Sequence, residues 1–329
     1  MWITKASIQT EANQVEALAD KHAKKMASTV TSAINITRDN QKVSELQEYV
    51  ESLNIQAAQA AGDQIGEMLQ GKGLPPDNKS FYDEFVATVE DAGNMAVSTL
   101  PTTLATTATF TVVNPYVTGW INNYTPQLIT EINETTRKAI YQTITDGLSQ
   151  KKHPRTVARD IKEIIGLTEN QAKAVVNYRM QLEAGKNLSG IQPAVARRIG
   201  LRDQKMIERH FENKYLTAQQ IDKMVERYRD SLVRLRSETI ARTESFRAMN
   251  EGRQLAWEDF VRQGVIEENN IRRFWSTARD DRVRPEHVAI PKMNKEGVGL
   301  REPFKTPSGN VMNPPFGVNC RCVSVVRVG

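Results

Sequence analysis

The chain has 329 residues, of which 39% are hydrophobic, and its mean hydropathy is −0.51; this length allows two or three domains, and no apolar run reaches the ~18 residues of a membrane-spanning helix. Two cysteines exclude a disulfide framework, and the first residues lack the basic and apolar segments of a secretory signal, so we expect synthesis in a cytoplasm. Residues 1–130 carry 8 basic and 14 acidic side chains, whereas residues 131–329 carry 36 and 25, so the second part suits a polyanion such as nucleic acid.

Residues 1–91 are predicted to form a helical N-terminal arm. Apolar side chains recur at spacings of three and four through residues 5–70, which is the period of one buried helix face. Glycines and prolines then end this pattern. A second helix is expected over about residues 81–97, where large apolar side chains again lie one turn apart.

Residues 92–130 contain no charged side chain and are rich in Thr, Asn and Pro. Thr and Val favour extended chain and prolines disfavour a continuous helix, so this stretch is predicted to be a connector. Thr125 and Pro126 are expected to cap and begin the next helix. We expect a partner or other copies of the chain to cover the connector. Transient membrane contact is the alternative, although hydroxyl and amide groups make insertion costly.

Residues 131–264 are predicted to form a basic helical domain, in which Thr168 caps one helix and another helix starts near Thr217. Two basic clusters are candidates for sequence-independent contact with the DNA backbone, and a solvated helix surface is the alternative. The first cluster is Lys151, Lys152, Arg155 and Arg159, and the second is Arg197, Arg198 and Arg202.

Residues 265–329 differ from the rest because prolines and glycines are frequent. Arg272–Thr277 and Val323–Val328 are expected to be extended, which predicts a small α+β module at the end of the chain. The predicted fold class is therefore mainly α, with long helical N-terminal and middle regions and a small α+β C-terminal domain.

Three segments of the C-terminal part carry the sharpest motifs. The first is Ala241-Arg242-Thr243-Glu244, inside a predicted helix. The second runs from Trp275 to His287 and contains Asp280, Asp281 and Arg284. The third runs from Asn313 through a proline-containing loop to Asn319-Cys320-Arg321-Cys322. In this order they resemble the C-terminal domain of the Mu F-like minor head proteins of tailed phages, over roughly residues 135–329.

The resemblance implies a structural role in head morphogenesis rather than catalysis. It implies a minor capsid protein, made in a bacterial host, that lies inside the capsid at the portal vertex. Its partners would be the portal protein, the packaged double-stranded DNA and other copies of itself, and it would act in assembly and in genome packaging or delivery. The motif residues expected to hold the fold together are Arg242, Glu244, Trp275, Asp280, Arg284 and Asn319.

The residues themselves also suggest a metal site. Cys320 and Cys322 are two apart, so a strand would present both thiols on one face. Thiolates, imidazole and carboxylate are zinc ligands, and His287 and Asp281 would complete a four-ligand set. In the alternative interpretation the cysteines are small buried hydrophobic side chains and His287 holds a loop by hydrogen bonding.

Two other functional classes remain to be weighed. The first is a metal-dependent hydrolase or a toxin-like enzyme fused to a phage module, with the acidic residues near His287 as ligands. Against it, the sequence shows no nucleophile–base pair, glycine-rich phosphate loop or His-Glu-x-x-His helix. Asp280 and its neighbouring arginines are expected to form buried ion pairs that fix a turn. The second class is a membrane-active DNA ejection protein that uses residues 92–130.

Overall fold

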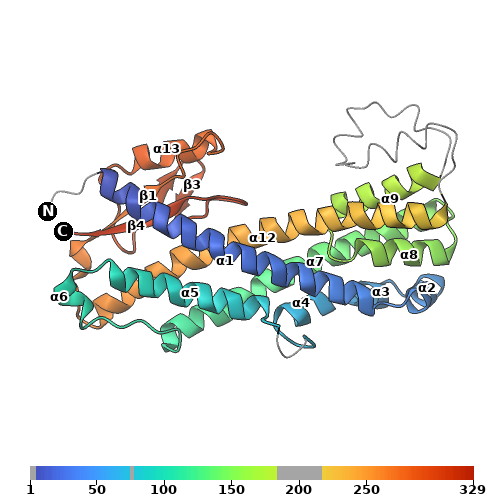
Figure 1. The fold of residues 1–329 in the computed structure, drawn as a ribbon, viewed down its shortest axis with the longest axis horizontal. Coiled ribbons are helices and arrows are strands. Elements are labelled where there is room, and N and C mark those ends of the chain that lie inside the picture. The colour runs from blue at the N-terminus through green and yellow to red at the C-terminus, as the bar shows by residue number, and fades with distance from the viewer. Residues whose placement is uncertain (1–4, 75–77, 184–216) are drawn as a thin grey trace. The chain divides into compact units, whose positions relative to one another are not determined.

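The computed structural model describes residues 5–74, 78–183 and 217–329. Helices make up most of this part of the chain, and short strands form two small sheets near its C-terminal end (Figure 1). This architecture confirms the predicted fold class, which is mainly α with a small α+β C-terminal part. Among the described helices, none is both long and apolar enough to cross a bilayer.

The elements follow one another with short connections in the described ranges. The helices are α1 (Lys5–Asn40), α2 (Val43–Glu51), α3 (Ile55–Ala60), α4 (Gln64–Leu69), α5 (Phe81–Ser98), α6 (Thr102–Ala105), α7 (Pro115–Ser149), α8 (Pro154–Ile164), α9 (Glu169–Glu183), α12 (Ala218–Arg262) and α13 (Pro285–Met293), with a 3₁₀ turn at Glu268–Asn270. The strands are β1 (Ile271–Ser276), β2 (Phe304–Thr306), β3 (Gly309–Val311) and β4 (Val323–Val328).

Two compact units are assembled from separate stretches of the chain. Unit 1 comprises Met1–Val30, Leu69–Gln127 and Ser237–Gly329, and unit 2 comprises Thr31–Met68 and Leu128–Arg236. The sequence predicted four consecutive segments instead. Composition could not reveal the interleaved arrangement, because α1, α7 and α12 each contribute residues to both units.

The core of unit 1 joins the first helix to the end of the chain. Buried side chains of α1, α5, α12 and β4 form one cluster: Ala12, Val15, Ala19, Ala92, Phe246, Met249, Val323 and Val325. Helices α5 and α12 approach closely at Gly252, where an added Cβ would lie 2.8 Å from the carbonyl oxygen of Val89. The β1–β4 sheet is thereby tied to α1, which passes beside it in Figure 1.

The uncharged stretch is largely helical, which corrects the prediction of an extended connector. Helix α5 runs into it, α6 lies within it, and α7 begins at Pro115 and continues through Pro126, so the expected cap at Thr125 is wrong. Proline at a first helical turn sacrifices no hydrogen bond, and one inside a helix removes only one. Buried side chains such as Val117 and Ile132 anchor α7 on either side of Pro126 and offset that loss.

Aromatic stacking covers part of the same stretch within unit 1. Trp120 and Tyr124 stack with parallel rings at a centroid distance of 5.3 Å, and Phe85 of α5 stacks on both. Val113 remains 79% exposed, however. Coverage by a partner or by other copies therefore stays a prediction for the exposed part.

Unit 2 packs helices around buried arginines. Helix α2 packs on α8, and Thr168 caps α9, since its hydroxyl accepts a hydrogen bond from the backbone N–H of Gln171. Thr217 likewise accepts from the Gln220 N–H at the start of α12, so the predicted cap at Thr168 and the predicted helix start near Thr217 are confirmed. Arg236 donates to the carbonyl oxygen of Gly166 at 2.6 Å and thereby fixes the turn between α8 and α9.

The two extended segments predicted near the C-terminus pair with each other. Strand β1 is antiparallel to β4, with Ile271 opposite Val328 and Ser276 opposite Val323. Strands β2 and β3 form a separate hairpin. The β1–β4 pairing brings the loop before β4 next to the segment that follows β1, and this is where the motif residues meet.

Candidate functional site

His287 lies in the first turn of α13. Arg284 precedes the helix in an extended conformation, and Pro285 occupies the first turn, where a missing N–H costs nothing. This start orients the imidazole inward, and its exposed fraction is 3%. The Phe316 ring packs on it at a centroid distance of 5.3 Å.

The two cysteines lie in the loop that leads into β4. Gly317 has φ of 124°, a conformation that only glycine adopts readily, and Asn319 has φ of 58°. Asn319 is fixed by α12, because its backbone N–H donates to the Thr243 hydroxyl at 3.0 Å. Asn250 of α12 then accepts from the Ser324 N–H at 2.8 Å and donates to the Cys322 carbonyl oxygen. Helix α12 therefore sets the path of the cysteine loop.

The structure brings the imidazole and both thiols together. Nδ1 of His287 lies 3.4 Å from Sγ of Cys320 and 3.4 Å from Sγ of Cys322. The three ligand atoms all lie within 4.8 Å of one another, and all three residues are buried. The backbone N–H of Cys322 also donates to Sγ of Cys320. Three electron-pair donors thus converge on one buried point.

The two thiols differ in acidity because they interact with each other. A hydrogen bond from Cys322 lowers the pKa of Cys320 from 9.0 to about 6, against the effect of burial. The pKa of Cys322 is raised, because its S–H donates to Cys320 and because it is buried. Cys320 is therefore the sulfur that carries negative charge first.

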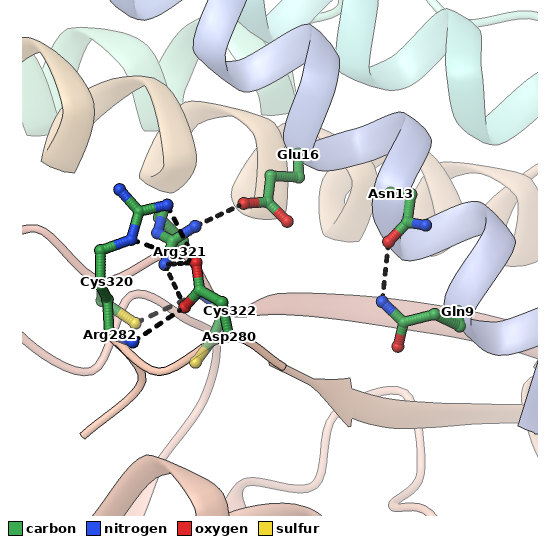
Figure 2. Close-up of polar contacts among 8 residues, drawn as sticks. All are labelled: Gln9, Asn13, Glu16, Asp280, Arg282, Cys320, Arg321 and Cys322. Atoms are coloured by element: carbon green, nitrogen blue, oxygen red, sulfur yellow. Dashed lines mark hydrogen bonds and ion pairs between the residues drawn. The ribbon is translucent and has the colours of Figure 1, made fainter. Parts of the chain in front are cut away.

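An ionic cluster lies beside the cysteines and includes α1 (Figure 2). Both carboxylate oxygens of Asp280 accept from Arg321 at 2.6 Å, and one also accepts from Arg282 at 2.9 Å. Arg321 reaches Glu16 of α1 at 3.1 Å. The hydrogen bond from Arg321 lowers the pKa of Asp280 from 3.8 to about 2. The cluster fixes Arg321 between the two cysteines.

A cavity of about 220 Å³ opens next to the buried triad. Four arginine side chains and the three candidate ligands contribute to its wall, which consists of Arg242, Ala278, Arg282, Val283, Arg284, His287, Asn319, Cys320, Arg321 and Cys322. Arg242 is exposed, and Arg284 donates to the Val318 carbonyl oxygen. The wall is positively charged, so the cavity favours anions.

Comparison with known proteins identifies the region that holds this site. Residues 182–325 match the family described as phage Mu protein F like protein. This part of the chain is similar to the Mu F-like family. No curated protein and no solved structure matches the chain. The Mu F-like region includes the whole triad and every residue that lines the cavity, so the site is a feature of the family-related part rather than of the N-terminal arm.

Three of the four predicted metal ligands come together in the structure, and the fourth does not. His287, Cys320 and Cys322 form the group, whereas Asp281 is exposed and lies outside it. Asp280 does pair with arginines, but its side chain is 30% exposed, so the pairs are half-buried rather than buried. Asp281, the next residue in the loop, is exposed to solvent instead.

The remaining motif residues lie in and around the same part of unit 1. Trp275 is buried with Cys320 and Cys322 and meets Phe304 edge-on at 5.2 Å. Glu244 accepts from the Tyr124 hydroxyl at 2.5 Å. Arg242 and Arg284 line the cavity, and Asn319 supplies the left-handed turn before Cys320.

Sequence reasoning missed two groups that shape the site. Glu16 lies far away in the sequence, on a helix with no motif, so nothing indicated its contact with Arg321. Arg273 is fully buried in β1 and donates to the Met312 carbonyl oxygen at 2.9 Å and the Asn313 amide oxygen at 2.7 Å. Arg273 lies two residues from both Ile271 and Trp275, so it shares their face of the strand, and this position was the available signal for its burial.

The structure also places part of the predicted DNA-contact set. Lys151 and Arg155 are exposed around the start of α8 in unit 2, and Arg159 is half-buried. Lys152 is bound to the buried Asp160 at 3.0 Å and is partly withdrawn from solvent. Arg197, Arg198 and Arg202 lie outside the described residues.

Proposed function

We propose that this chain is a minor head protein of a tailed phage that attaches to the portal protein at the portal vertex, inside the capsid. The supporting observation is the match of residues 182–325 to the Mu F-like family, whose role is phage head morphogenesis. Within unit 1, the ionic cluster and the shared core tie the C-terminal part of this region to the first part of α1, so these two parts are proposed to act together in attachment.

An infection experiment tests the role in the head. The gene is interrupted by an amber codon, and particles made in suppressor and non-suppressor hosts are compared. We expect the protein in purified wild-type virions by mass spectrometry, and defective heads or undelivered genomes without it. Wild-type virions that lack the protein would contradict the proposal.

We propose further that the basic face of unit 2 contacts packaged DNA without sequence preference. Lys151, Arg155 and Arg159 supply the charge, since Lys152 is engaged by Asp160. Such contacts position a protein on phosphates and carry no sequence information. Binding should therefore weaken steeply with salt and be equal for unrelated duplexes.

A matched pair of variants tests the DNA contact. Lys151→Ala, Arg155→Ala and Arg159→Ala are combined in one protein. Lys138→Ala, Lys173→Ala and Lys223→Ala are combined in another, where three exposed lysines elsewhere on unit 2 are removed with the same change of charge. Removal of Lys151, Arg155 and Arg159 should make the slope of log affinity against log salt less steep by up to about 2.7, at about 0.9 per phosphate contact. Equal slopes for the two sets would refute a localised DNA surface.

The chain is proposed to be structural rather than enzymatic. The structure places both cysteines beside an imidazole, and three ligand atoms that converge on one point favour a metal site over a nucleophile–base pair. A nuclease assay with and without chelator separates the classes, and metal-dependent cleavage by the wild-type chain would favour the enzyme.

A further inference from the structure

We propose that His287, Cys320 and Cys322 bind one Zn²⁺ ion through Nδ1 and the two Sγ atoms, and that its fourth coordination position opens into the arginine-lined cavity. The proposal rests on the geometry of this cluster and not on the role in the phage head. The ligand set is two thiolates and one imidazole, which is suited to zinc among the common divalent ions.

The spacing of the three atoms agrees with a tetrahedral zinc ion. Zinc binds sulfur at about 2.3 Å and imidazole nitrogen at about 2.0–2.1 Å, so a sulfur and a nitrogen on one ion lie about 3.5 Å apart. Nδ1 of His287 lies 3.4 Å from each sulfur. Equal distances to both sulfurs are expected around a common centre. A single N–H···S hydrogen bond would instead favour one sulfur.

Protein hydrogen bonds alone leave this cluster incompletely satisfied. Nδ1 carries at most one proton and cannot serve two sulfurs equally. The other ring nitrogen, Nε2, is buried without a hydrogen bond to any described residue, and the nearest carboxylate oxygen, on Glu286, is 3.7 Å away. Metal on Nδ1 would fix the proton on Nε2, and a carboxylate is the usual outer partner of such a histidine.

The charges around the cluster define the fourth position. Two thiolates and a neutral imidazole cancel the charge of Zn²⁺, so the centre itself would be neutral. Asp280 and Glu16 engage Arg321 from one side. Arg242, Arg282 and Arg284 contribute to the remaining wall of the cavity that the three ligands share. An open position beside guanidinium groups suits water or a small oxyanion such as phosphate, because arginine binds oxyanions in a bidentate manner.

Metal content and cobalt substitution test the site directly. Full-length protein is purified without a histidine tag, under reducing conditions, and its zinc is measured by mass spectrometry. We expect one zinc per chain. The cobalt form should show thiolate-to-cobalt charge transfer in the near ultraviolet and intense tetrahedral bands in the visible. The chain has only two cysteines, so the charge transfer must come from Cys320 and Cys322.

Variants distinguish the proposed metal ligands from other buried polar residues of unit 1. Cys320→Ser and His287→Gln should each lose the cobalt charge-transfer spectrum or weaken metal affinity at least tenfold. His22→Gln is the matched control, since His22 is also buried in unit 1 but bonds to Asp91, and it should retain the metal. If the ligand variants do not fold, the wild-type protein still decides the question. Folded, reduced wild-type protein that takes up neither zinc nor cobalt overturns the proposal.

The open position has its own test with inorganic phosphate as the probe. Titration of the cobalt form with phosphate should shift its visible bands, and Arg242→Ala should weaken the titration at least threefold. Lys305→Ala, an exposed change on β2 outside the cavity wall, is the control. Unchanged bands at saturating phosphate would show that the fourth position is closed and would overturn that half of the proposal.

Discussion

Replacement of Arg273 by Met should destabilise unit 1 by about 3–5 kcal/mol, the range found when one partner of a buried charged network is removed. Arg273 donates to the backbone carbonyl oxygens of Gly299, Glu302 and Met312 and to the Asn313 side chain. All four acceptors lie between α13 and the cysteine segment, on either side of the β2–β3 hairpin. The substitution removes four hydrogen bonds from a charged donor, each worth about 1.5–3 kcal/mol.

One opposing contribution limits the effect. Burial lowers the pKa of Arg273 from 12.5 to about 10, which corresponds to about 3 kcal/mol of unfavourable burial of charge. Methionine removes that cost and retains much of the packing on Phe304, whose ring centroid lies 5.0 Å from the guanidinium. Without this relief, the loss of four hydrogen bonds would exceed the predicted range.

Urea unfolding monitored by tryptophan fluorescence measures the loss, and hydrogen exchange of residues 299–313 locates it. Arg273→Lys is the informative companion, because it keeps the charge but loses the planar fork that reaches several acceptors. We expect it to be at least as destabilising as Arg273→Met. If both variants lie within about 0.5 kcal/mol of the wild type, which is the range of neutral surface changes, the reasoning is refuted.

Three further predictions concern the core, the ionic cluster and the aromatic stack. Gly252→Ala should lower the free energy of unfolding by about 1–3 kcal/mol, because the new Cβ would meet the Val89 carbonyl oxygen. Gly119→Ala, with open space around the new Cβ, should raise it by up to about 1 kcal/mol. Equal shifts in melting temperature for the two variants would contradict this. Asp280, with its pKa lowered to about 2, contributes stability that is present above about pH 4 and is lost as the pH falls through the folded pKa. Asp280→Asn should therefore flatten the acid side of the curve of unfolding free energy against pH. An unchanged curve would refute the role of the ionic cluster. Tyr124→Phe removes the hydrogen bond to Glu244 and should cost about 1 kcal/mol in urea unfolding, with the exposed Tyr141→Phe as a control without effect.

The sequence carried enough information for the local structure of the C-terminal region. The expected extended segments Arg272–Thr277 and Val323–Val328 agree with β1 to within one residue and with β4, and Thr168 and Thr217 marked helix starts because their hydroxyls cap free backbone N–H groups. The two-residue spacing of Cys320 and Cys322, with His287 in the preceding motif, indicated the triad. The strands and helix starts depend mainly on neighbouring residues, so the local sequence pattern is enough to predict them.

Long-range arrangement could not be predicted in the same way. Proline and threonine content suggested an extended connector, yet α7 passes through Pro126, because burial on both sides outweighs a local preference. The contact of Glu16 with Arg321 joins the two ends of the chain and leaves no mark on composition or spacing. Asp281 and Asp280 are neighbours in sequence, and only the turn geometry decides which one faces the arginines.

An asymmetric cryo-EM reconstruction of the portal vertex in mature virions tests the central claim most directly. We predict density for this chain on the inner side of the portal, with its Mu F-like region traceable and the basic face of unit 2 toward the DNA. A portal vertex fully accounted for by other proteins, in virions that contain the chain elsewhere or not at all, would contradict the account.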